Sequence, residues 1–272
     1  MKIILTCIVL LSSLQYAFAD TTLTFADALK NTRAVSLTYS IKDMQLKLTQ
    51  SGQNTVNVYS SQNSSFVSFN TDTGKSTNLN EQILNKRVSQ LNKERLQKLA
   101  KVQKQLPKEL PNMTPAQQQT SETLINLYKY PEFYGEHTSL VVSKLKQTKQ
   151  VNGLKCQPYQ LYKIDRLLKA FCLADAGSLN MSDAEYKTLR SFYAFNYSMQ
   201  SRLLIALGNT KFTLIDYEQH NMPGVVIEEI EYQKSSPTQP QISYHSALKG
   251  IHHQPLKSSE FDIKKPTGNK LE

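Results

Sequence analysis

The segment Leu154–Ala174 reads LKCQPYQLYKIDRLLKAFCLA and is the best guide to the class of fold. Apolar residues dominate both halves, and the polar residues around Ile164 predict a hairpin turn between two strands. With the turn centred on Ile164, Cys156 and Cys172 would face each other, with Cβ atoms about 4.5–5.5 Å apart. We therefore predict an antiparallel sheet and a Cys156–Cys172 disulfide, with two buried free thiols as the alternative.

The N-terminus predicts export. Residues 1–19 contain one lysine, the apolar run Ile3–Leu14 and an Ala-x-Ala site, which together are typical of a signal peptide cleaved between Ala19 and Asp20. The run is shorter than the roughly 20 residues that a transmembrane helix needs. Only two cysteines follow it, as is usual for a disulfide in an oxidising compartment. We expect a soluble periplasmic protein without a transmembrane segment, with secretion as the second choice.

Period-2 alternation predicts most of the strands. Val35, Leu37 and Tyr39 alternate with polar residues, as in a half-buried strand. Further strands are predicted at 46–48, 56–58, 66–69, 139–143, 212–217, 225–232 and 242–251. For residues 22–31 we instead predict a short helix, because Thr24 is followed three residues later by Asp27, in a capping pattern.

Three-to-four-residue spacing predicts longer helices. One covers residues 80–106 and ends before Pro107 and Pro111. A second begins at Thr114-Pro115 and runs to about Lys129, and a third runs from the capping residue Ser182 to Gly208. We predict a single α+β domain over 20–272, with a helical insertion at 80–130 and a flexible basic tail at 264–272.

Composition excludes some classes of function. The formal net charge is +10, or +9 once Lys2 is removed with the signal peptide. The lysines are spread along the chain, with no basic stripe and no nucleic-acid-binding motif, so we predict no nucleic-acid partner.

Catalytic and cofactor motifs are missing from the sequence. It has no Gly-x-Ser-x-Gly elbow, His-Glu-x-x-His, P-loop or dinucleotide fingerprint, so we predict no cofactor. The adjacent His252 and His253 would point to opposite faces of a strand, and no metal site is predicted. Glu228, Glu229 and Glu231 are interpreted as a solvated strand face. A non-enzyme is favoured over an unrecognised hydrolase.

The third predicted helix is aromatic and apolar over more than one face, especially between Tyr186 and Tyr197. Packing against a sheet is the commoner fate of such a helix. The alternative is that it lines a cavity for a hydrophobic ligand. The candidate lining residues are Val35, Leu37, Tyr39, Phe192, Phe195 and Met199.

Several short segments resemble an uncharacterised family of bacterial secreted domains, which is similar in architecture to the periplasmic lipoprotein carriers. They are VNGLKCQPY at 151–159, CLA at 172–174, LNMS at 179–182, MPGVVIE at 222–228 and FDIKKPTG at 261–268. The last segment departs from the family's closing Phe-x-Ile-Pro-x-Gly-Tyr, because its proline is displaced and Asn269 replaces the tyrosine. The resemblance implies an open half-barrel, a curved antiparallel sheet wrapped around helices, whose concave face holds acyl chains. It supplies no catalytic residue.

Two functional hypotheses follow. The first is a periplasmic protein that binds a lipid or another hydrophobic ligand in the concavity of a carrier-like sheet. The alternative is a non-enzymatic interaction or structural module of the cell envelope, whose 80–130 helices contact an envelope protein. The sequence leaves the oligomeric state open.

Overall fold

The computed structural model describes residues 20–29, 36–133, 139–209, 213–233 and 240–263. The predicted signal peptide with Ala19, the candidate residue Val35 and the basic tail at 264–272 lie outside these ranges.

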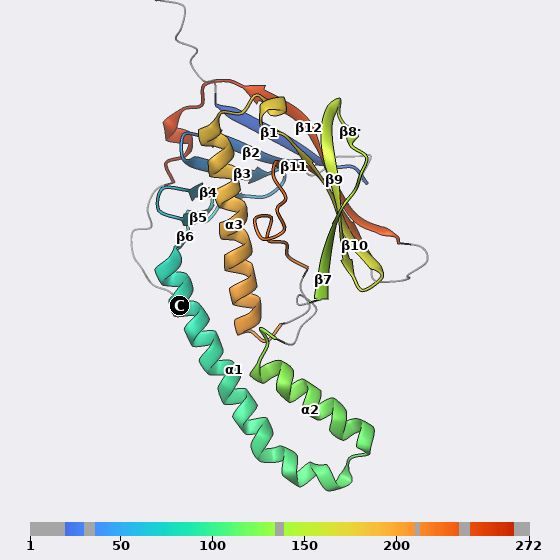
Figure 1. Ribbon diagram of the computed structural model, residues 1–272. Coiled ribbons are helices and arrows are strands. Elements are labelled where there is room, and N and C mark those ends of the chain that lie inside the picture. Colours follow the sequence, from blue (N-terminus) through green and yellow to red (C-terminus); the bar gives the residue numbers. More distant parts are fainter. Residues whose placement is uncertain (1–19, 30–35, 134–138, 210–212, 234–239, 264–272) are drawn as a thin grey trace, which may run out of the picture.

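The fold is α+β and is built on one large open antiparallel sheet (Figure 1). Its 12 strands follow the order β6-β5-β4-β3-β2-β1-β12-β11-β10-β9-β7, and β8 pairs with β9. The strands are β1 (Thr21–Asp27), β2 (Ser36–Lys42), β3 (Gln45–Gln50), β4 (Thr55–Ser60), β5 (Ser65–Asn70), β6 (Ser76–Leu79), β7 (Leu140–Lys144), β8 (Lys149–Val151), β9 (Leu154–Lys163), β10 (Arg166–Ala174), β11 (Val225–Tyr232) and β12 (Ile242–His253).

Helix α3 (Asp183–Ala206) crosses one face of this sheet and contacts β2, β3 and β11 (Figure 1). It begins at the predicted cap: Ser182 accepts a hydrogen bond from the Glu185 backbone, and Glu185 accepts one from Ser182. Leu189 and Phe192 of α3 join the main core cluster, together with Leu23 of β1 and Ile41 of β2. Burial of this helix face against the sheet stabilises the centre of the molecule.

Helices α1 (Glu81–Glu109) and α2 (Pro115–Lys129) form an arm that projects beyond the sheet (Figure 1). The arm occupies the predicted insertion and connects β6 to β7, which are the two edges of the sheet. The first turns of α1 lie against α3, where Arg202 forms an ion pair with Glu81 at 2.7 Å. The buried residues of α1 repeat at helical spacing and are Leu84, Leu91, Arg95 and Leu99.

The predicted helix at 22–31 is wrong, because this segment contains strand β1. Leu23 and Phe25 are buried while Thr22 and Thr24 are less so, which is the alternation of a strand. β1 pairs with β2 on one side and with β12 on the other. Pairing with a strand more than two hundred residues away therefore overrides the local capping pattern.

Two boundaries also differ from the prediction. Helix α1 continues past Pro107 to Glu109, and a short 3₁₀ turn at Leu110–Asn112 follows. Pro107 is exposed and lies in the last turn, so its ring removes one hydrogen bond near the end of the helix without breaking it. The strand expected at 212–217 is absent from its described part, 213–217, which is irregular.

The Cys156–Cys172 disulfide is confirmed, with Cα atoms 5.5 Å apart. The register behind the prediction is wrong by two residues, because Cys156 lies opposite Ala174 and Cys172 lies opposite Pro158. One residue of the difference arises because the turn is centred between Ile164 and Asp165, so that Arg166 pairs with Lys163, and an irregularity between Leu167 and Lys169 adds the second. The disulfide therefore joins diagonal neighbours on one face of the hairpin. Such a bond is typical of proteins outside the reducing cytoplasm.

Candidate functional site

A cavity of about 310 Å³ lies between α3, the sheet and the segment 213–217. The sheet contributes lining residues from β1, β2, β10, β11 and β12. This volume is at the small end of the range for ligand sites in proteins, about 300–1,000 Å³. Aromatic residues supply much of the lining: Phe25, Tyr39, Phe171, Phe192, Tyr193, Tyr197, Tyr217 and Tyr244.

The lining rings pack against one another and form a continuous wall. The ring of Tyr39 lies 5.3 Å from that of Phe25 and 6.3 Å from that of Phe192, between centroids. Tyr217 lies 5.2 Å from Tyr193 and 6.0 Å from Phe171. These contacts fix the ring orientations without filling the space between them.

Of the predicted lining residues, the structure brings Leu37, Tyr39 and Phe192 to the cavity. Phe195 instead packs in the core against Tyr59, with ring centroids 5.2 Å apart, and Met199 packs against the same core cluster. Val35 lies outside the described residues. The aromatic helix therefore has both roles that the sequence suggested: one part fills the core and another part lines a cavity.

A charged cluster at the cavity was missed by the sequence reasoning. Lys169 of β10 forms an ion pair of 3.0 Å with Glu229 of β11 and a second ion pair with Glu231. Lys169 and Glu229 line the cavity. The register places Phe171 opposite Glu229 and Lys169 opposite Glu231, so pairing of β10 with β11 brings these residues together. Burial lowers the pKa of the Lys169 ammonium, but the two carboxylates outweigh burial and raise it overall.

The interpretation of the glutamates as a solvated face is wrong for Glu228, which is only 9% exposed. Its carboxylate forms an ion pair with Lys149, and His245 Nε2 lies 3.1 Å from its Oε1. Glu228 also lines the cavity. The carboxylates of β11 contact Lys149, Lys169 and His245. These three residues lie on other strands, so the sequence of β11 alone could not predict them.

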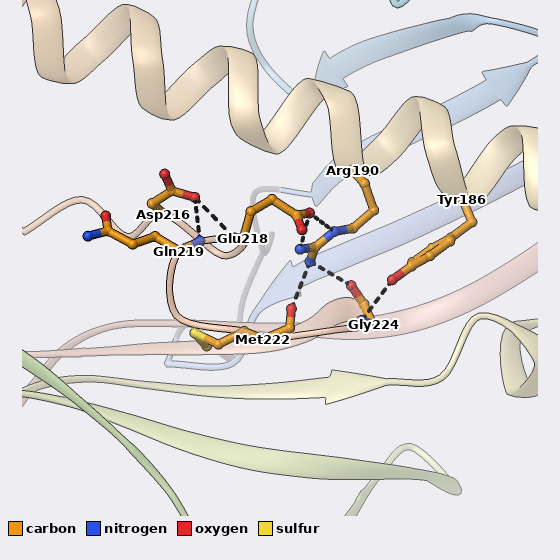
Figure 2. A network of polar contacts seen from close by, with 7 residues as sticks. All are labelled: Tyr186, Arg190, Asp216, Glu218, Gln219, Met222 and Gly224. Carbon is orange, nitrogen blue, oxygen red and sulfur yellow. Dashed lines mark hydrogen bonds and ion pairs between the residues drawn. The ribbon is translucent and has the colours of Figure 1, made fainter.

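One wall of the cavity, the segment that contains Ile215 and Tyr217, is held in place by Arg190 of α3 (Figure 2). Arg190 Nη1 donates hydrogen bonds to the backbone oxygens of Met222, at 2.9 Å, and Gly224, at 3.2 Å. Its Nε donates to Glu218 Oε1 at 2.9 Å. The guanidinium also lies over the Tyr217 ring, 5.8 Å from its centroid. Arg190 is thus a structural anchor for this wall.

Backbone geometry completes the anchor. The Gly224 backbone N–H donates a 3.0 Å hydrogen bond to the Tyr186 hydroxyl (Figure 2). Asp216 Oδ1 accepts hydrogen bonds from the backbones of Glu218 and Gln219, and this fixes the turn. β11 begins directly after Gly224, so the same contacts set the position of Val226 in the cavity wall.

The phenols of the cavity are neutral at physiological pH. Burial, followed by the negative charge of Glu229, raises the pKa of Tyr39 and Tyr217 well above the ordinary value of about 10. Burial also raises the pKa of Tyr193. These hydroxyls therefore act as hydrogen-bonding groups and not as bases.

Within the described ranges, no group of three or more His, Cys, Asp and Glu residues is placed to hold a metal ion. A membrane-crossing helix is likewise not found among the helices that the structure describes.

Comparison with known proteins gives little. No family model matches the chain, and no curated protein matches it. A solved structure described as "Structure of PNGF-II in C2 space group" matches with a TM-score of 0.37 and 7% sequence identity. The match covers 91% of this chain but 30% of the other, so this chain spans less than a third of that protein. Similarity at this level carries no argument about function, and the resemblance to the bacterial secreted domains stays a prediction.

Proposed function

We propose that the protein is a periplasmic binding protein for a small hydrophobic or amphipathic molecule, which it holds between α3 and the sheet. The observation that carries this proposal is the 310 Å³ cavity, whose wall contains many aromatic residues. The same wall presents apolar residues from distant elements, including Phe25, Leu37 and Ile215. A concave apolar site with a few convergent polar groups is the usual form of a small-molecule site.

The carrier-like half-barrel belongs to this proposal. The open sheet and the crossing helix α3 support it, and the disulfide supports a periplasmic location. Much of the space between sheet and helix is filled by Tyr59, Phe195 and Phe66, whose rings are in contact. The remaining volume suits a compact ligand better than the several acyl chains of a lipoprotein.

Titration with the neutral fluorophore N-phenyl-1-naphthylamine tests the proposal. We expect saturable binding at one site by the full chain. The variant L37W places a bulky side chain at the cavity. It should weaken binding by at least about tenfold, because it reduces the volume that is available to the ligand. L96W is the matched control, since Leu96 is 49% exposed on the arm. Absence of saturable binding, or equal binding by L37W and L96W, would refute the proposal.

A second candidate function is supported by the arm. None of the side chains between Ala100 and Tyr130 is buried, although Val102 and Leu124 are apolar and about half exposed. Helix pairs normally bury such residues against each other or against a partner. We propose an envelope protein as the partner of this surface.

Photo-crosslinking in the producing cell tests the second candidate. A crosslinker at Val102 should give one discrete protein adduct, whereas one at Lys93, an exposed residue on the opposite side of α1, should not. Equal adducts from both positions, or none from Val102, would remove the arm as a docking surface.

A further inference from the structure

Negatively charged side chains outnumber positively charged ones at the cavity. Among the described lining residues, Lys169 is cationic, while Glu228 and Glu229 are anionic. Glu228 is already paired with Lys149 and contacts His245. Glu229 shares the single ammonium of Lys169 with Glu231. One cation therefore faces two carboxylates at this end of the cavity, which leaves a net negative charge.

This balance disfavours an anionic ligand. A carboxylate or phosphate bound to Lys169 would bring a third negative group beside Glu229 and Glu231. The Lys169 side chain is only 14% exposed, so water screens that repulsion poorly. A positively charged group near Glu229 would instead complete the neutralisation of the cluster.

The tyrosines supply the remaining features of a cation site. No hydrogen bond joins the hydroxyl of Tyr39 or Tyr217 to another residue in the described part of the chain, so both oxygens remain available to a donor. The negative charge of Glu229 reaches both, because it contributes to their raised pKa values after burial. Aromatic faces attract cations as well.

We propose that the cavity selects a small amphipathic amine, whose protonated ammonium lies at Glu229 and whose apolar body lies along the aromatic wall. This inference rests on the proposed binding function and specifies its ligand class. Glu229 is the residue that sets the charge preference, and the Tyr39 and Tyr217 oxygens accept the remaining ammonium hydrogens.

Three eight-carbon ligands with different head groups test the preference. Octylamine, octanol and octanoate compete with N-phenyl-1-naphthylamine at pH 7.5, where the amine is protonated and the acid is ionised. We expect octylamine to compete at least about tenfold better than octanoate, with octanol between them. Stronger competition by octanoate, or equal competition by all three, would overturn the inference while leaving the binding function intact. Failure of the fluorophore itself to bind would count against the binding function.

Two variants assign the preference to one residue. E229Q should weaken octylamine binding by at least about tenfold and change octanol binding much less. Octanol binding thus reports that E229Q is folded. E231Q is the matched control, because Glu231 contacts the same lysine but is not part of the cavity lining. It should weaken octylamine binding clearly less than E229Q does, because it removes the same net charge but leaves the carboxylate at the ammonium position. Equal effects of E229Q and E231Q would show that the site has no specific ammonium position.

Discussion

Replacement of Gly224 by alanine should lower the free energy of unfolding by roughly 3 kcal/mol, from two additive causes. Gly224 has φ of +107°, a conformation that costs an L-residue about 1–2 kcal/mol or more. A Cβ atom there would also lie 2.6 Å from the backbone oxygen of Ala174 and 3.3 Å from Leu173 Cβ. The oxygen belongs to β10, so the start of β11 must move away, at a further cost of about 1–3 kcal/mol.

Urea unfolding followed by far-ultraviolet circular dichroism measures this cost. The matched control is G52A, because Gly52 has φ of +76° but no atom within 4 Å of the added Cβ. G52A should lose only the conformational part, about 1–2 kcal/mol. Since Val226 follows in the cavity wall, G224A should also weaken N-phenyl-1-naphthylamine binding. Equal stability of G224A and G52A would refute the argument that the close approach of β10 requires glycine.

Three further predictions concern other elements. The double variant C156A/C172A should lose about 3 kcal/mol of stability, because the disulfide closes a loop with a sequence separation of 16. Urea unfolding with and without reductant measures this loss. A free energy of unfolding equal to that of the wild type under oxidising conditions would contradict it. Ile164 is 76% exposed and has φ of +56° in the turn between β9 and β10. The variant I164G should therefore raise the urea midpoint of unfolding by the equivalent of about 1 kcal/mol. A lower midpoint would show that the Ile164 side chain makes stabilising contacts. Burial first, and then Glu229, raises the pKa of Tyr39, so the folded state holds this phenol neutral while the unfolded chain ionises it near pH 10. The resulting stability is complete below that pH and is lost as pH rises above it. Y39F should therefore reduce the loss of stability between pH 10 and 11 by about 1 kcal/mol, and an unchanged loss would refute the assignment.

Local patterns were sufficient for elements whose signals lie within a few residues. The capping box at Ser182 and Glu185 and the helix start at Thr114 are both present in the structure, because capping is set by contacts three residues apart. The disulfide is also present, as the predicted export and the even cysteine count indicate whatever the exact register. The register itself depends on the exact centre of the turn and on an irregularity near Leu168, and neither has a clear signature in the sequence.

Long-range pairing accounts for the failures. The segment with Leu23 and Phe25 is a strand because β12 and β2 lie on either side of it, and no local signal carries that information. The charged end of the cavity has the same origin, since Lys169 and Glu229 are sixty residues apart in sequence. Alternation on β11 placed Glu229 and Glu231 together on one face, but only the pairing of β10 with β11 shows that a lysine lies between them.

The arm has a mechanical consequence. Helix α1 has 29 residues, so it extends for about 44 Å. Its base is fixed to α3 by the Arg202–Glu81 ion pair and by the buried stripe that begins at Leu84, while its far end carries no buried side chain. The buried stripe ends at Leu99, so the last ten residues of α1 form a lever of about 15 Å that acts through the packed part on α3, the helix that supplies Phe192 and Tyr193 to the cavity. A force on the arm would therefore exert torque on the cavity wall that Phe192 and Tyr193 help to form.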